Sequence, residues 1–184
     1  MGKARRLRGP APATAAPRLL GKPVSLSRVQ MTELVLPNDA NTLGNVLGGR
    51  VMHWIDMACA MAAQRHARRS VVTASVDRVH FLHPVKVGQQ VIVFASVNAA
   101  WGSSMEVGAR VEAEDPHTGE RVHTAAAYTT FVALDESNRP VPVPPLLLET
   151  DADRRRWREA QKRREGRLQE KAARKRRRRG TAAR

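Results

Sequence analysis

A long apolar segment preceded by a polar, glycine-containing loop constrains the fold of this chain more than any other feature. The loop runs from Asn38 to Gly48 and is rich in the Asn, Asp and Gly residues that favour tight turns. Apolar residues then cover most of the helical circumference from Gly49 to about Ala67, which predicts a buried helix. One carboxylate, Asp56, lies about two turns into this helix. The fold must therefore surround one helix and accommodate its single acid.

Five stretches rich in β-branched and alternating apolar residues predict strands. One precedes the loop and the helix, and four follow with short connections that favour antiparallel neighbours. A change of phase near Asp77 predicts a β-bulge. This order predicts an α+β domain in which a five-stranded antiparallel sheet wraps around one central helix. The expected strands cover residues 24–36, 71–82, 87–99, 105–113 and 121–134.

Charge divides the chain into a nearly neutral middle and two basic ends. The formal net charge is +15, of which residues 1–23 contribute +6 and residues 151–184 contribute +11. The middle of the chain is therefore close to neutral, and it is long enough to bury a core. We predict a disordered basic arm at residues 1–23, a folded domain at 24–136, a proline-rich linker at 137–149 and a basic helical tail at 150–184.

Cysteine, histidine and hydropathy patterns narrow the possible chemistry and compartment. Cys59 is the single cysteine, which excludes an intrachain disulfide and is more consistent with packing than with a nucleophile. The six histidines do not show metal-ligand spacing, so we predict no metal. The sequence contains neither a transmembrane run nor a secretory signal, which favours a cytoplasmic protein. An arginine-rich transit peptide at the N-terminus is the alternative.

The start of the helix offers a site for a polarised carbonyl group. The first backbone N–H groups of a helix lack intrahelical partners and carry partial positive charge. Gly48 and Gly49 would let a ligand oxygen approach those groups, as in an oxyanion hole. Asp56, held among Met and Cys side chains, is then a candidate general base or nucleophile. Alternatively, Asp56 pairs with His53 or with a partner chain, and the glycines serve only the turn.

Five residues in this region match the pattern N-x-x-G-x-x-x-G-G-x-x-x-x-x-x-D, namely Asn41, Gly44, Gly48, Gly49 and Asp56. On this pattern the chain resembles the acyl-CoA thioesterases of the hotdog fold, the group that contains the cytosolic acyl-CoA hydrolases. The segments 71–77, 81–85 and 102–105 also resemble that family, and the likeness covers about residues 25–135. The basic ends lie outside it.

The resemblance implies an active site shared between two copies of the chain, in a dimer or a trimer of dimers. In that family the residue at Asp56 acts as general base or nucleophile. The residue at Asn41 of the facing protomer orients water or the carbonyl group, and the backbone N–H at Gly49 polarises the carbonyl. The positions expected to contact the substrate or its coenzyme A portion are Gly48, Gly102, Ser103 and Ser104.

The function implied is hydrolysis of acyl-CoA to a free fatty acid and coenzyme A, with no cofactor beyond the coenzyme in the substrate. A non-catalytic module that binds acyl-CoA or nucleic acid through its basic ends is the alternative. A hotdog dehydratase is disfavoured because the loop lacks a histidine. The basic ends are most simply solvated, although they could bind nucleic acid, an anionic surface or the coenzyme phosphates. Trp101 is expected to cap a turn or to lie on the adenine.

Overall fold

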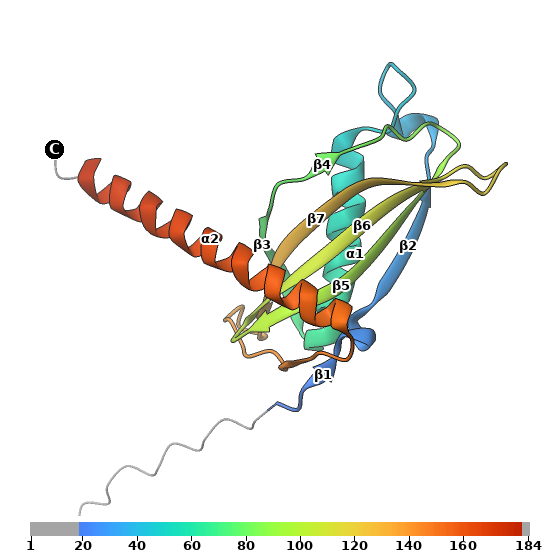
Figure 1. Ribbon diagram of the computed structural model, residues 1–184. Coiled ribbons are helices and arrows are strands. Elements are labelled where there is room, and N and C mark those ends of the chain that lie inside the picture. The colour runs from blue at the N-terminus through green and yellow to red at the C-terminus, as the bar shows by residue number, and fades with distance from the viewer. Residues whose placement is uncertain (1–18, 182–184) are drawn as a thin grey trace, which may run out of the picture.

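Five long strands form one curved antiparallel sheet around a central helix, which confirms the predicted fold (Figure 1). The structure is a computed structural model that describes residues 19–181. The strand order is β2-β5-β6-β7-β3, and a short strand, β4, pairs with β7 beside β3. The bounds are β2 Val29–Leu34, β3 Ser70–Val76, β4 His80–Phe81, β5 Gln90–Trp101, β6 Ser104–Glu114 and β7 Arg121–Leu134.

Two predicted strands are shorter than the sequence suggests. In the region 24–36, residues Val24–Ser27 form a 3₁₀ helix (η1), and only the part from Val29 onward pairs as β2. The region 71–82 is divided into β3 and β4, and its bulge lies between Thr73 and Ser75 rather than near Asp77. Alternation alone could not locate these interruptions, because they depend on pairing with β5 and β7.

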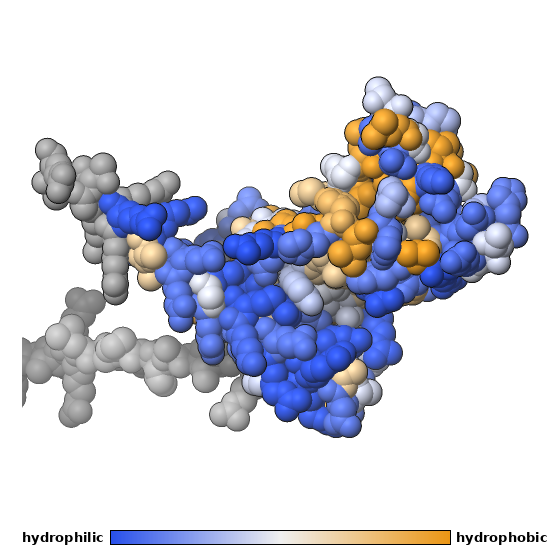
Figure 2. All heavy atoms as spheres, turned by 45° about the horizontal axis from the view of Figure 1, so that its top comes forward, coloured by the Kyte–Doolittle hydropathy of each residue, from blue (hydrophilic) through white to orange (hydrophobic). Residues whose placement is uncertain are grey.

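The central helix α1 (Gly48–Ala67) packs its apolar residues against the concave face of the sheet. Ala58, Cys59 and Ala62 are fully buried there. The expectation of burial on nearly all sides is wrong, because Met52 and Met61 are 45% and 39% exposed. A single sheet covers one side of the helix and leaves the other open. Figure 2 shows hydrophobic side chains gathered over the end of the molecule where α1 begins.

The segment after β7 returns along the domain instead of leaving it. Val141 and Val143 donate backbone hydrogen bonds of 2.9 and 2.8 Å to Ala133 and Gly102. The buried ring of His66, near the end of α1, hydrogen-bonds through Nε2 to the carbonyl oxygen of Pro144 at 2.8 Å. This segment ends in β8 (Leu146–Leu147), which pairs in parallel with β1 (Lys22–Pro23). Residues 1–18 of the predicted arm lie outside the described part of the chain.

The basic helix α2 (Asp151–Thr181) crosses the outer face of the sheet and then extends beyond it (Figure 1). Its start is fixed by Thr150 and Asp153, whose side chains accept each other's backbone N–H groups at 3.1 and 3.0 Å. Ala160 is fully buried against the domain. Neither helix in the described range combines the length and apolar character needed to cross a membrane.

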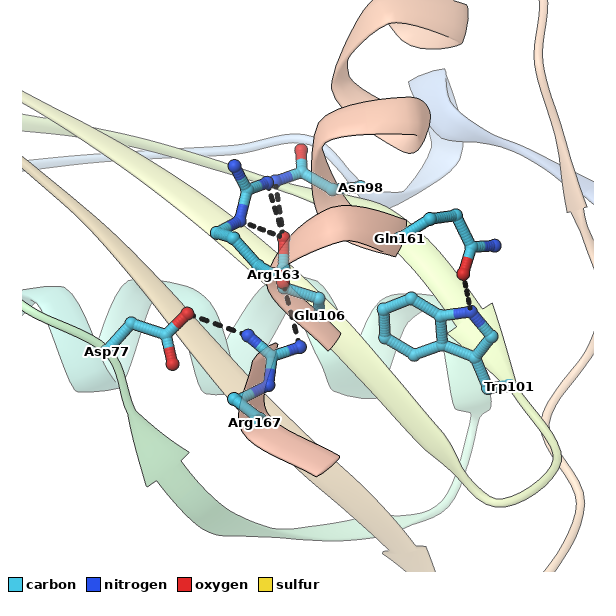
Figure 3. A network of polar contacts seen from close by, with 7 residues as sticks. All are labelled: Asp77, Asn98, Trp101, Glu106, Gln161, Arg163 and Arg167. Carbon is cyan, nitrogen blue, oxygen red and sulfur yellow. Dashed lines mark hydrogen bonds and ion pairs between the residues drawn. The ribbon is translucent and has the colours of Figure 1, made fainter. Parts of the chain in front are cut away.

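An ionic network beneath α2 holds its middle onto the sheet (Figure 3). Glu106, fully buried on β6, accepts from Arg163 at 2.7 Å and from Arg167 at 3.0 Å. Arg167 also donates to Asp77, after β3, at 2.7 Å. The Arg163 guanidinium lies 3.6 Å from the centre of the Tyr128 ring on β7. The two arginines offset the cost of burying the Glu106 carboxylate. Removal of the arginines, or of Glu106, would leave a charge without its partner in this buried region.

Candidate active site

The loop before α1 is anchored by Asp39, a buried residue that sequence reasoning did not single out. One of its carboxylate oxygens accepts the N–H of Leu36 at 3.0 Å, and the other accepts Nε of Arg50, in the first turn of α1, at 2.6 Å. The backbone N–H of Leu36, together with Arg50, lowers the pKa of Asp39 despite its burial. The Leu47 N–H also donates to the Asp39 carbonyl oxygen at 2.8 Å. Asp39 therefore ties both ends of the loop to the helix.

Asn41 lies in the exposed part of this loop. Its side-chain oxygen accepts from the N–H groups of Leu43 and Asn45 at 2.9 and 3.2 Å, which folds the loop into a tight turn. Gly44 completes the turn with a φ of +74°, in the left-handed region that glycine adopts without strain. The side-chain nitrogen of Asn41 has no hydrogen-bond partner within residues 19–181. Its N–H groups are thus available to a ligand or to a second chain.

The glycine pair opens α1 as predicted. Leu47 precedes the helix without a side-chain cap, and the first intrahelical donors are Arg50 and Val51, both bonded to the Leu47 carbonyl oxygen. The N–H groups of Gly48 and Gly49 have no partner in the described chain. A Cβ atom at Gly49 would meet no atom within 4 Å, so space is open beside it. A Cβ atom at Gly48 would instead lie 3.5 Å from the Phe81 ring. The helix N-terminus therefore offers unpaired donors, with open space beside Gly49.

Asp56 lies half-buried on α1, seven residues and about two turns beyond Gly49. Its partner is Thr73 on β3, whose hydroxyl Oγ1 donates to Asp56 Oδ1 at 2.8 Å. His53 is exposed and makes no hydrogen bond to Asp56 in the described structure, so the predicted alternative of a His53 pair is not observed. Sequence reasoning missed Thr73. The sequence feature that could have identified it is that Thr73, a polar residue, lies on the same face of the strand as Val71, which packs against the core.

Cys59 lies on α1 beneath this acid and is fully buried. The pKa of the Cys59 thiol is raised to about 12, chiefly by burial; a hydrogen bond with Thr129 opposes the shift and the nearby Asp56 charge adds to it. The thiol is therefore protonated at neutral pH and cannot supply a thiolate nucleophile. Of the residues on this part of α1, Asp56 remains the reactive candidate.

The predicted coenzyme positions Gly102, Ser103 and Ser104 lie in the β5–β6 hairpin. Gly102 has a φ of +52°, which the tight turn requires. Ser104 donates to the Trp101 carbonyl oxygen at 3.2 Å and lines an open groove of about 630 Å³. Within the described chain no hydrogen bond joins this hairpin to Asn41 or Asp56.

The sequence suggested that Trp101 caps the hairpin, but its side chain contacts α2 instead. Its indole N–H donates to Gln161 of α2 at 2.9 Å, and the Arg164 guanidinium lies 4.7 Å from the centre of its ring. Trp101 therefore joins the hairpin to α2. In the portion that the structure describes, no group of three or more His, Cys, Asp or Glu side chains is arranged to hold a metal ion.

Comparison with known proteins places this geometry in a family. A sequence model described as the thioesterase superfamily matches residues 43–120. An uncharacterised acyl-CoA thioester hydrolase of Bacillus subtilis is 42% identical over 127 residues, which is 69% of this chain and 74% of that protein. The chain spans about a quarter of the mammalian acyl-coenzyme A thioesterases that it also matches (25% and 26%).

Solved structures agree with these sequence relatives. A hexameric acyl-CoA thioesterase superposes with a TM-score of 0.81 at 40% identity, covering 84% of this chain and 99% of its own. An acyl-CoA hydrolase of Staphylococcus aureus, solved with butyryl coenzyme A and coenzyme A, has a TM-score of 0.78 at 36% identity and covers 84% of this chain and 94% of its own.

The Staphylococcus enzyme has also been solved as three alanine variants, of an asparagine, an aspartate and a threonine. These three positions follow one another at intervals of 15 and 17 residues. Asn41, Asp56 and Thr73 have the same order and the same intervals of 15 and 17 residues. With its hotdog fold and this degree of identity, the chain belongs to the acyl-CoA thioester hydrolases of the thioesterase superfamily.

Proposed function

We propose that this protein hydrolyses acyl-CoA thioesters to a free fatty acid and coenzyme A, with Asp56 as the reactive carboxylate. The observation that carries the proposal is the hydrogen bond from Thr73 to Asp56, about two turns beyond the open start of α1. The shared spacing of Asn41, Asp56 and Thr73 with the substituted residues of the Staphylococcus enzyme supports it. Thr73 fixes one carboxylate oxygen, which leaves the other oxygen to react.

The reaction then uses the groups at the helix start and on the helix. The thioester carbonyl oxygen accepts the free N–H of Gly49, which stabilises the negative charge that develops there. In one route Asp56 takes a proton from water while the water oxygen adds to the carbonyl carbon. In the other, Asp56 attacks that carbon directly, and water then hydrolyses the resulting acyl-Asp56 anhydride to the free acid and the regenerated carboxylate. The C–S bond breaks, and the coenzyme leaves as a thiolate that takes up a proton. Gly48 lies beside the carbonyl and lets the substrate approach closely.

The side-chain nitrogen of Asn41 in a second copy orients the attacking water or the carbonyl. Asn41 is exposed, and its oxygen is already engaged within its own loop, which leaves the N–H groups for a neighbouring chain. The exposed apolar side chains of α1, of β3, of β4 and of the residue after β4 provide a surface for this self-association, and the hexameric relative supports it. These side chains are Met52, Met61, Val72, Val76, Phe81 and Leu82.

The replacement Asp56→Asn tests the proposal because it keeps the shape of the side chain and removes its basicity. We expect kcat for a panel of acyl-CoA substrates, from acetyl to palmitoyl, to fall at least about a hundredfold. The matched control is Asp151→Asn, at a 98% exposed carboxylate at the start of α2. Wild-type turnover in Asp56→Asn, with the protein folded, would exclude this mechanism.

A further inference from the structure

A basic groove on the outer face of the sheet is not used by the proposed active site. We propose that it binds the phosphorylated nucleotide end of acyl-CoA, so that the basic helix α2 is part of the substrate site. This proposal rests on the proposed function for the identity of the substrate. The groove has a volume of about 630 Å³ and lies between α2, the edge strand β3 and the β5–β6 hairpin.

Basic side chains on one face of α2 form a wall of this groove. They are Arg164, Arg167, Lys171 and Arg174, which follow one another at intervals of three, four and three residues. Such intervals place side chains on one face of a helix. Glu170 is the acid among the residues that line the groove. The groove therefore has an excess of positive charge, which suits phosphate groups.

Two of these cations have no acidic partner among residues 19–181. Arg167 is occupied by Asp77 and Glu106 (Figure 3), and Arg164 lies over the Trp101 ring. Lys171 and Arg174 make no ion pair with any residue that the structure describes. Lys171 and Arg174 lie one and two helical turns beyond Arg167. The buried network holds α2 at Arg167 and so also sets the position of the backbone at these two residues. The available charge is thus held at a defined place beside the sheet.

The groove also offers an aromatic surface for a base. Trp101 lines it, and its ring orientation is fixed by the hydrogen bond to Gln161 and by the Arg164 guanidinium. A nucleotide base can stack on such a ring or on the plane of an arginine, at about 1–3 kcal/mol per base. Phosphate-binding cations next to a stacking surface match the two parts of a nucleotide. This combination distinguishes the groove from a merely basic surface.

The position of the groove connects it to the proposed reactive group. Ala74 and Ser75 line the groove, and they follow Thr73, which holds Asp56, directly along β3. Each strand residue advances by about 3.3 Å. β3 therefore borders both the groove and, through Thr73, the proposed reactive carboxylate. The flexible arm that joins the nucleotide of coenzyme A to its thioester would span the distance between them.

The decisive variant is the double replacement Lys171→Ala/Arg174→Ala in the full chain. For acyl-CoA we expect KM to rise roughly tenfold, with kcat nearly unchanged, because the lost contacts lie far from the reacting atoms. For the same acyl group on pantetheine, which lacks the nucleotide, KM should not change. The matched control is Arg158→Ala/Lys162→Ala, which removes two exposed cations of α2 that do not line the groove. An unchanged KM for acyl-CoA, or an equal rise for both thioesters, would overturn the proposal.

Calorimetry with coenzyme A separates this proposal from the proposed function. Even if the wild-type protein hydrolyses no thioester, loss of coenzyme A binding in the double variant but not in the control would support nucleotide binding in the groove. Free ADP is the second ligand. We expect ADP to bind more weakly than coenzyme A and to compete with acyl-CoA. ADP binding that depends on Lys171 and Arg174 without competition, or tighter binding of single-stranded RNA than of coenzyme A, would contradict the assignment to the substrate.

Discussion

Thr73 Oγ1 lies 2.8 Å from Asp56 Oδ1 and joins the edge strand β3 to the central helix α1. The two residues are 17 positions apart in the chain and come from different elements. A hydroxyl in this position donates to the carboxylate, which fixes the rotamer of Asp56 and directs its second oxygen away from Thr73. The reactivity proposed for Asp56 depends on this orientation.

Thr73→Val should reduce turnover without unfolding the strand, because valine is also β-branched and of similar shape. A hydrogen bond to a charged group contributes about 1.5–3 kcal/mol, so kcat should fall roughly tenfold or more. Thr73→Ser retains the hydroxyl and should restore most of the loss. Steady-state kinetics on the three proteins measures this. Equal activity of the valine and wild-type proteins would show that Thr73 has no positioning role.

Asp39→Asn should loosen the loop that carries Asn41, because the amide loses the ion pair with Arg50. We expect faster amide hydrogen exchange in residues 40–47 and a lower kcat/KM. The pKa of Asp39 is below its ordinary value of 3.8, so its contribution to stability is complete above that pH and is lost as pH falls through the lowered value. Asp115→Asn, in the β6–β7 turn, is the control. Wild-type exchange and activity in Asp39→Asn would exclude this anchor.

Glu106→Gln should release the middle of α2 from the sheet, since it leaves Arg163 and Arg167 without their buried anion. Removal of one partner of a buried ion pair costs about 3–5 kcal/mol, which urea unfolding would detect. Glu112→Gln removes an ion pair with the exposed Arg110 on the same strand and should cost less than about 1 kcal/mol. Similar losses in the two variants would mean that the network does not stabilise the helix.

His66 should make the protein less stable in mild acid. Burial lowers the pKa of His66, and its second ring nitrogen, Nδ1, is buried without a hydrogen-bond partner in the described structure. The native state therefore favours the neutral ring, so the His66 contribution is complete above its ordinary pKa of 6.5 and is lost as pH falls toward the lowered value. Thermal unfolding between about pH 7.5 and 5.5 should show a steeper decline for wild type than for His66→Gln. His117→Gln, in an exposed turn, should keep the wild-type slope, and identical slopes in all three proteins would contradict this role.

The sequence patterns predicted the parts of this molecule that depend on local signals. The alternation of β5, β6 and β7 and the glycine pair before Asp56 identified the sheet, the central helix and the start of that helix. Thr73 was missed because its contact with Asp56 depends on the register of an edge strand that contains a bulge. Strand periodicity assigns a residue to a face but does not show what lies opposite it.

Glu106 illustrates the same limit for tertiary structure. It alternates with Met105 and Val107, so its strand pattern is typical of a solvent-facing residue. The helix that covers it begins at Asp151, and the arginines that neutralise it resemble any solvated basic helix when the sequence is considered alone. Only the packing of α2 on the sheet shows that this acid is buried and that the basic helix is attached.

The central claim is that Asp56 acts with Asn41 of a second copy, and mixing two inactive variants tests it most directly. Asn41→Ala and Asp56→Ala chains would be produced together and compared with each variant alone. In random dimers the Asp56 of one chain meets the Asn41 of the other in about one site in four, so the mixture should regain about a quarter of wild-type turnover. Turnover no greater than the mean of the two separate variants, with assembly intact, would contradict a site shared between chains.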